Sequence, residues 1–172
     1  MLFFGGGWQN GSPAQFYPQC ARFAALGMVA ISADDRIASR NHTSPREAVG
    51  SPVTLAGLVL FNPVIDNGPG GYGYDRVKDY YQEISPLHNL MAGMPPTLVM
   101  FGTKDKFVPG ATAEKFKADT IALGNRCDLI FYEGQAHGFF NYKAEGNPYF
   151  EQSMTAAEAF LASIGVLPAA KP

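Results

Sequence analysis

The sequence is poor in cysteine, in long apolar runs and in clustered charge. Its 172 residues include two cysteines, Cys20 and Cys127, whose positions fit neither a metal site nor a disulfide framework. No apolar run approaches the ~20 residues that cross a bilayer, so we expect a soluble protein with no membrane partner. Lysine and arginine are scattered singly and the formal net charge is −2, which leaves no basic stripe for nucleic acid. We therefore expect a small molecule or another protein as the partner, with no metal and no cofactor.

The sequence is rich in apolar residues, which make up 47% of the chain and are enough to build a core. Short apolar runs of the kind that form buried strands alternate with helical patterns. The predicted strands lie at Met1–Phe4, at Met28–Ala33, within Ala56–Asp66, after Pro96 and after Cys127. The predicted helices run from Ser12-Pro13 to Gly27, from Thr112 to Leu123 and from Pro148 to Ser163. This order predicts a single α/β domain over residues 1–172, a three-layer sandwich around a mostly parallel five-stranded sheet.

Two residues with catalytic chemistry follow consecutive predicted strands. Asp105 follows the fourth strand and His137 follows the fifth, so both are expected at the carboxyl edge of the sheet, where ligands bind in such folds. A carboxylate that accepts a hydrogen bond from one imidazole nitrogen leaves the other nitrogen to act as a base. We predict that they form a catalytic pair. The alternatives are an aspartate that stabilises a turn and a histidine bonded to the backbone of its loop.

Three glycines, Gly5 to Gly7, follow the first predicted strand. Such a turn can point backbone N–H groups at one spot and stabilise an oxyanion, or it can serve only as a tight connection to the helix. A phosphate-binding loop fits less well, because neither a Lys-Ser/Thr ending nor a G-x-G-x-x-G spacing follows. Trp8 either lines the same pocket or packs beneath the loop. Tyr72, in the glycine- and tyrosine-rich stretch Asn67–Asp75, either walls a substrate pocket or belongs to a plain turn.

Several stretches together resemble the α/β-hydrolase esterase and lipase family, in the group related to hormone-sensitive lipase and small acetyl esterases. They are "FFGGGWQNGSPAQFYPQCARFAALGMVAISADDRIASR", "LVLFNPVIDNGPGGYGYDR", "ISPLHNL", "PPTLVMFGTKDKFVP" and "YEGQAHGFFNY". The resemblance implies that Gly6 and Gly7 donate to the oxyanion, that Asp105 is the catalytic acid and that His137 is the base. The common first residue of the glycine motif is histidine, where this chain has Phe4.

The family's nucleophile elbow, Gly-x-Ser-x-Gly, occurs nowhere in this sequence. Ser51 comes nearest, but valines stand two residues to either side and Pro52 follows it, so it is at best a weak nucleophile and otherwise a loop serine. Compared with the family, the chain passes directly from the lead-in of one helix to the strand after the elbow. If the remaining strands close this gap, the strand order becomes 2-1-3-4-5. The sheet face left bare would then favour a homodimer.

Two functions from different classes remain open. The first is a carboxylic ester hydrolase for short acyl esters, in a shortened form that uses Ser51, a water activated by His137 or a residue of a second chain. The second is a catalytically inactive α/β module for binding or assembly, or a gene fragment. The compartment also stays open: no signal peptide precedes the first strand, and the resemblance implies an earlier strand pair before the segment that matches Met1.

Overall fold

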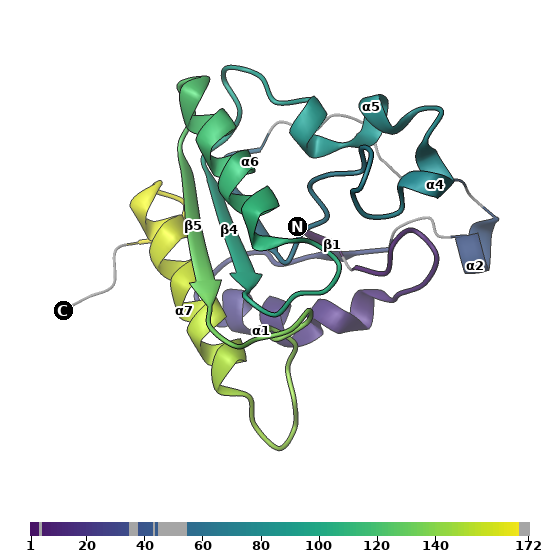
Figure 1. Cartoon of the computed structure of the whole chain (residues 1–172). Coiled ribbons are helices and arrows are strands. Elements are labelled where there is room, and N and C mark those ends of the chain that lie inside the picture. The colour runs from purple at the N-terminus through teal and green to yellow at the C-terminus, as the bar shows by residue number, and fades with distance from the viewer. Residues whose placement is uncertain (4, 35–37, 43, 45–54, 169–172) are drawn as a thin grey trace. The chain divides into compact units, whose positions relative to one another are not determined.

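The computed structural model describes residues 1–3, 5–34, 38–42, 44 and 55–168 (Figure 1). The chain divides into two compact units, Met1–Pro52 with Asn141–Asn147, and Val53–Phe140 with Pro148–Pro172. The first unit carries the glycine turn, and the second carries Asp105 and His137. Each unit is described by itself below. The assignment of the whole chain to one domain stays a prediction.

The first unit holds a two-stranded parallel sheet with helix on it. Strand β1 (Leu2–Phe3) pairs with β2 (Ser32–Ala33), Leu2 opposite Ser32. The 3₁₀ helix η1 (Pro13–Phe16) begins where the sequence places a cap: the Ser12 side chain accepts a hydrogen bond from the Ala14 amide, and Pro13 takes the first helical position. The Ser32 hydroxyl donates to the Pro13 carbonyl at 2.7 Å, which ties η1 to the sheet.

Helix α1 (Tyr17–Ala25) continues from η1, and α2 (Ala38–Asn41) is a single turn. Phe16 and Phe23 are the buried apolar residues of this layer. Of the predicted strand Met28–Ala33, only Ser32 and Ala33 pair in the sheet, and Val29 is 89% exposed. The expectation that Met28–Ala33 forms a strand covered on both faces is therefore wrong for the described residues. The reason is the size of this unit, whose described part offers little beyond η1 and α1 to pack on a sheet.

The second unit is built on a three-stranded parallel sheet in the order β3-β4-β5. Strand β4 (Thr97–Gly102) lies in the middle, between β3 (Leu58–Phe61) and β5 (Cys127–Tyr132). Every residue of β4 is buried, as expected for a central strand with neighbours on both edges and helices on both faces. The register sets Gly102, the last residue of β4, opposite Tyr132, the last residue of β5. The loops that follow these two strands therefore start side by side.

Two long helices cover the faces of this sheet: α6 (Gly110–Ala122) lies in front of it in Figure 1 and α7 (Pro148–Ser163) lies behind it. Alternate residues of β4 serve the two layers. Val99 and Phe101 pack in one cluster with Phe116 of α6. Met100 points to the other side, where its sulfur accepts a hydrogen bond from the Tyr132 hydroxyl. The apolar core of the second unit thus has helix on both faces of the sheet.

The segment between β3 and β4 adds three short helical turns. They are α4 (Tyr74–Val77), α5 (Tyr81–Ile84) and the 3₁₀ helix η2 (Pro86–His88). Fully buried Val77 and Ile65 anchor the segment to the core.

The predicted α/β class with parallel strands is confirmed. The expected neighbours within the order 2-1-3-4-5 are also found, β1 beside β2 and β4 between β3 and β5. The pairing of β1 with β3 would join the two units, and it stays a prediction. The ladder between β1 and β2 has two residue pairs, and that between β4 and β5 has six. Among the described residues, no helix is long and apolar enough to cross a membrane.

Candidate active site

Asp105 lies in the loop that joins β4 to α6. Its amide donates to the carbonyl of Gly102 at 3.1 Å, which turns the chain directly after the strand. Its carboxylate oxygen Oδ1 accepts hydrogen bonds from the amides of Phe107 at 2.7 Å and Val108 at 3.2 Å. The side chain is 1% exposed. One carboxylate oxygen is thus held by the backbone of its own loop, and only Oδ2 is left for another partner.

That partner is His137, in the loop after β5. The imidazole Nδ1 lies 2.8 Å from Asp105 Oδ2, and the imidazole remains 39% exposed. A carboxylate can only accept a hydrogen bond, so Nδ1 carries the proton in this pair. The other ring nitrogen, Nε2, then presents a lone pair. A buried carboxylate behind an accessible imidazole is the arrangement of a general base.

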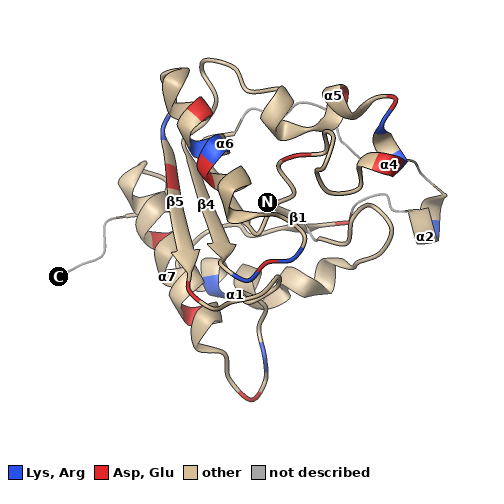
Figure 2. Cartoon of the chain, in the orientation of Figure 1, with Lys and Arg blue, Asp and Glu red and all other residues tan. Residues whose placement is uncertain are grey.

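The two loops are also joined through their backbones. The Lys104 amide donates to the Gln135 carbonyl at 2.8 Å, and the Gly134 amide donates to the Thr103 hydroxyl at 2.8 Å. Gly102 makes this approach feasible, because a Cβ there would overlap the Gln135 carbonyl oxygen. Around Asp105 the charges alternate in sign, with Lys104 and Lys106 on either side of it (Figure 2). The pair of residues is therefore positioned by the paired ends of β4 and β5.

The glycine turn belongs to the first unit and follows β1. Gly6 needs to be glycine, because a Cβ on it would overlap the Asn10 carbonyl. Its own carbonyl accepts from the amides of Gln9 and Asn10 at 3.1 and 3.2 Å, which closes the turn. Gly7 and Trp8 both have positive φ, 58° and 63°. The Trp8 carbonyl accepts from the amide of Ala38, so the turn is linked to α2.

Comparison with known proteins assigns the chain to a family. A model of the dienelactone hydrolase family matches residues 67–166, more than half of the chain and the part that holds Asp105 and His137. The chain belongs to the dienelactone hydrolase family. No curated protein matched the sequence.

Solved structures of esterase 2 from Thermogutta terrifontis are similar to this family member over nearly its whole length. The native thermophilic esterase is 30% identical, with a TM-score of 0.88 over 99% of this chain and 83% of that one. The butyrate-bound form is 29% identical, with a TM-score of 0.89 over 99% and 84% of the two chains. The form phosphonylated by sarin is 31% identical, with a TM-score of 0.89 over the same shares. These neighbours confirm the α/β-hydrolase resemblance.

The remaining predicted site residues of this dienelactone hydrolase family member fall in different places. Ser51 lies outside the described residues. Tyr72 lies in the second unit, and its ring stands edge-on to the ring of Phe107 with 5.8 Å between centroids. Phe107 in turn stands edge-on to the imidazole of His137 at 5.0 Å. Sequence reasoning missed Phe107, although its position two residues after Asp105 was a usable signal.

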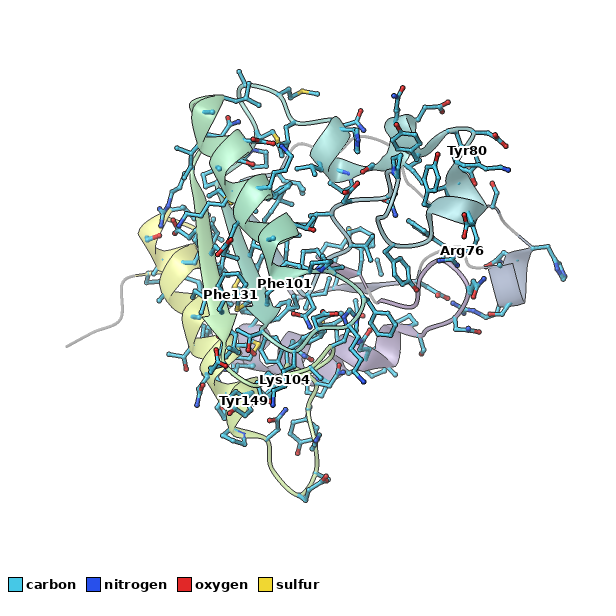
Figure 3. All side chains as sticks on the ribbon, viewed as in Figure 1. Arg76, Tyr80, Phe101, Lys104, Phe131 and Tyr149 are labelled. Atoms are coloured by element: carbon cyan, nitrogen blue, oxygen red, sulfur yellow. The ribbon has the colours of Figure 1, made fainter. Side chains whose placement is uncertain are left out.

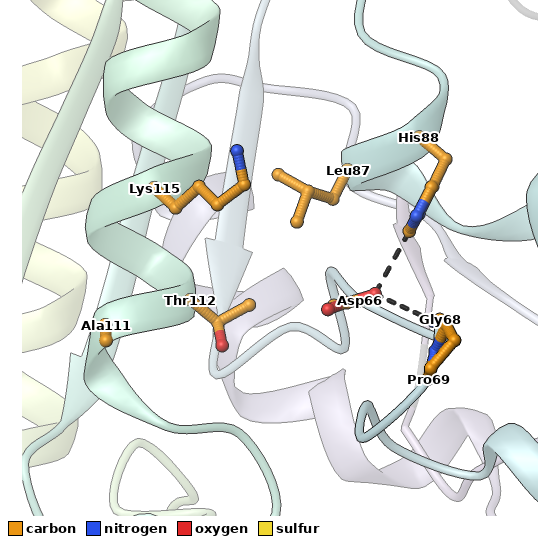
Figure 4. A pocket seen from close by; sticks show the side chains of 8 residues that line it. All are labelled: Asp66, Gly68, Pro69, Leu87, His88, Ala111, Thr112 and Lys115. Carbon is orange, nitrogen blue, oxygen red and sulfur yellow. Dashed lines mark hydrogen bonds and ion pairs between the residues drawn. The ribbon is translucent and has the colours of Figure 1, made fainter.

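A second histidine of the second unit, His88, lies in a similar polar cluster but in an arrangement unlike that of His137. Its Nδ1 is 2.9 Å from the Ser85 hydroxyl oxygen and 3.8 Å from an oxygen of Asp66, at an open pocket of about 360 Å³ beside the first turns of α6 (Figure 4). Both contacts are to the same ring nitrogen, so the imidazole cannot pass a proton from serine to aspartate. Ser85 is fully buried and its oxygen also accepts from the Asn67 amide. The geometry agrees with a structural role for His88.

Of the two cysteines, Cys127 is buried and Cys20 is partly buried. Burial raises the pKa of Cys127, which is buried in the core, and desolvation also raises the pKa of the half-buried Cys20. Burial likewise raises the pKa of Tyr132. At the surface of the first unit, a hydrogen bond from Arg40 lowers the pKa of Asp34. No group of metal-ligating side chains is found within the described ranges.

Proposed function

We propose that this chain hydrolyses small carboxylic esters, with His137 as the general base and Asp105 as the group that orients it. The observation that carries the proposal is the 2.8 Å contact between an accessible imidazole and a carboxylate that is 1% exposed. Membership of a hydrolase family and likeness to esterases support the same reaction class.

The reaction divides into two proton transfers. Nε2 of His137 takes the proton of an attacking hydroxyl as its oxygen bonds to the carbonyl carbon, and Asp105 stabilises the imidazolium that results. The tetrahedral intermediate then collapses, the bond between the carbonyl carbon and the alcohol oxygen breaks, and the imidazolium returns the proton to that oxygen. When the attacking hydroxyl belongs to a serine, water repeats the same two transfers on the acyl-enzyme, which releases the acid and restores the serine. The backbone amides of Gly6 and Gly7 are proposed as donors to the oxyanion, and Trp8 as a lining residue.

Short acyl groups are the proposed substrates. Esterase 2 from Thermogutta terrifontis has been solved with propionate and with butyrate bound. Acetyl, propionyl and butyryl esters of p-nitrophenol therefore form the first substrate series for this chain.

Covalent labelling can identify the group that supplies the attacking hydroxyl. Esterase 2 is phosphorylated by paraoxon and phosphonylated by sarin. Incubation of this chain with a fluorophosphonate, followed by intact-mass measurement and peptide mapping, tests whether one serine is activated. A single adduct on Ser51 assigns the attack to that serine. Turnover that depends on His137 without any adduct assigns it to water.

Substitution of His137 tests the base itself. General-base catalysis contributes typically about 10²–10⁴-fold, so His137→Ala should lower kcat/KM for p-nitrophenyl butyrate by a factor in that range. His88→Gln is the matched control, because it changes the other polar histidine cluster of the same unit and should leave kcat/KM within about twofold of the wild type.

Asp105→Asn gives a sharper test of the pair. The amides of Phe107 and Val108 already donate to Oδ1, so the new amide oxygen would take that position and its NH₂ group would face His137. This side-chain orientation forces the proton onto Nε2, which can then no longer act as a base. The expected result is a loss of kcat/KM comparable to that of His137→Ala, with the protein folded by circular dichroism. Equal activity of Asp105→Asn and the wild type would contradict the proposed role.

The absence of Gly-x-Ser-x-Gly from the whole sequence favours one alternative, an inactive module for binding or assembly. The same experiments separate the two functions. A chain that forms no adduct, and whose hydrolysis of p-nitrophenyl esters is unchanged in His137→Ala, is the inactive module.

A further inference from the structure

Two aromatic rings stand in series beside the imidazole of His137. Phe107 meets His137 edge-on, with 5.0 Å between ring centroids and 86° between ring planes. Tyr72 meets the same phenyl ring at 5.8 Å and 89°. We call Tyr72 and Phe107 the aromatic wall. The Phe107 side of this wall is accessible, because that residue is 52% exposed.

The exposed ring of Phe107 is held in place from its backbone. The Phe107 amide donates to Asp105 Oδ1 at 2.7 Å, and the next residue, Val108, is buried in the core of the second unit. The same residue therefore contacts both members of the catalytic pair: its amide binds the carboxylate and its ring packs on the imidazole. A half-exposed phenylalanine so anchored offers a preformed surface at low entropic cost.

Tyr72 is anchored independently. Its amide donates to the Asp66 carbonyl at 3.0 Å, and its carbonyl accepts from the Asn67 side-chain amide at 2.9 Å. Arg76, which belongs to α4 and is labelled in Figure 3, has its guanidinium 5.4 Å from the centroid of the Tyr72 ring, a cation–π contact. Both residues of the wall are thus held by contacts within the second unit.

The chemistry of ester hydrolysis tells which part of a substrate meets this wall. The imidazole returns its proton to the alcohol oxygen as the carbonyl–oxygen bond breaks, so that oxygen must come within hydrogen-bonding distance of Nε2. A ring packed against the imidazole is therefore beside the alcohol portion of the ester and away from its acyl chain. This reasoning rests on the proposed function.

We infer that the aromatic wall is the subsite for the leaving alcohol, and that the site takes esters of aromatic alcohols in preference to esters of saturated ones. Edge-to-face and offset contacts between aromatic rings are worth about 0.5–1.5 kcal/mol beyond the area they bury, which corresponds to a preference of roughly 2- to 10-fold per ring contact. Phe107 is the specificity-determining residue, since its ring lies next to the imidazole. Tyr72 contributes through its edge-on contact with the Phe107 ring.

The test compares benzyl acetate with cyclohexylmethyl acetate, which share the acyl group and differ in the aromaticity of an alcohol of similar size. The wild type should favour benzyl acetate in kcat/KM by about 2- to 10-fold. Phe107→Leu keeps an apolar side chain and the backbone donor to Asp105, and it should remove that preference by lowering kcat/KM for the benzyl ester alone. An equal loss for both esters would show that Phe107 acts only through the structure of the loop, and would overturn the inference.

Tyr81→Leu is the matched control. Tyr81 stands edge-on to His88 with 5.1 Å between centroids and 85° between planes, the same kind of aromatic contact in the other histidine cluster. The substitution should leave the ratio of the two esters unchanged. If Tyr81→Leu changed the ratio of kcat/KM for the two esters as much as Phe107→Leu, the preference would not come from a subsite at Phe107.

A binding experiment separates this inference from the proposed function, because it needs no turnover. Benzyl alcohol should shift the NMR signals of His137 and of the Phe107 amide, cyclohexylmethanol should do so less, and Phe107→Leu should abolish the difference. If these shifts occur in a chain that hydrolyses no ester, the subsite stands and the hydrolase proposal fails. If esters are hydrolysed without any preference for the benzyl group, the hydrolase stands and the subsite fails. Absence of both turnover and binding overturns both.

Discussion

The two units carry the same kind of feature, a turn with candidate site residues directly after a parallel strand, but they hold it in different ways. In the second unit, Asp105 and His137 follow six-residue strands, and their loops are bonded to each other through Lys104 and Gln135. In the first unit, the glycine turn follows a two-residue strand and closes on itself through the carbonyl of Gly6. Neighbouring strands position side chains in one case. Local backbone conformation shapes the turn in the other.

The difference extends to the packing. Every residue of β4 is buried, whereas the first unit leaves Val29 almost fully exposed. We therefore expect the second unit to provide most of the stability of the chain and the first to open more readily.

The largest expected effect comes from the core of the second unit. Phe101 of β4 is fully buried and packs in one cluster with Phe116 of α6. Phe101→Ala should therefore lower the free energy of unfolding by about 3–5 kcal/mol, because burial is lost and a cavity is left behind. Val29→Ser in the first unit should change it by less than about 0.5 kcal/mol, because that side chain is already in water. Urea denaturation of the two variants measures both values. Similar losses would contradict the contrast between the units.

The second effect is local to the first unit. Gly6→Ala places a Cβ on the Asn10 carbonyl, so the turn has to open, at a cost of at least about 1–3 kcal/mol. Amide hydrogen exchange should accelerate in the glycine turn and η1 and stay unchanged in β4 and β5.

Gly27→Ala is the control for that substitution. Gly27 also has a positive φ, 86°, but a Cβ there would meet nothing within 4 Å, so only the conformational cost remains. Its effect on exchange in the glycine turn should be smaller than that of Gly6→Ala. Faster exchange in β4 and β5 of Gly6→Ala would show that the two units unfold together.

The smallest effect is a dependence on alkaline pH that belongs to the second unit. Burial raises the pKa of Tyr132, so its phenol ionises in the unfolded chain before it does so in the folded one. The stabilisation is complete below the pKa of the unfolded chain, about 10, and is lost as pH rises from there through the higher pKa of the folded state. Tyr132→Phe should therefore lose less stability than the wild type between about pH 9 and 11, as measured by urea denaturation.

An exposed tyrosine of the first unit serves as the comparison. Tyr142→Phe makes the same chemical change in a side chain that is 53% exposed, and its pH profile is measured beside that of Tyr132→Phe to control for the loss of a tyrosine hydroxyl as such. Burial also raises the pKa of Cys127, so both variants should retain the part of the alkaline loss of stability that Cys127 causes. Identical pH profiles of Tyr132→Phe and the wild type would show that burial of Tyr132 does not cause the loss of stability at alkaline pH.

Sequence patterns were sufficient for the second unit and less so for the first. The apolar runs after Pro96 and Cys127 predicted β4 and β5, and the positions of Asp105 and His137 after these strands predicted that the two side chains lie near each other. The run Met28–Ala33 was equally apolar, yet only Ser32 and Ala33 pair as a strand. An apolar run indicates that a segment is suited to burial. Whether it is buried depends on packing partners elsewhere in the chain, which a local pattern does not reveal.

The sequence by itself determined the class of fold, the order of strands within each sheet and the residue types of the candidate site, because periodicity and turn chemistry are local properties. Only the tertiary structure decided that Asp105 offers its second oxygen to His137 and that Phe107 packs on the imidazole. These features depend on distances between residues about 30 or more positions apart in the chain. Such distances are set by the register of neighbouring strands and by the packing of the core, which no short stretch of sequence specifies.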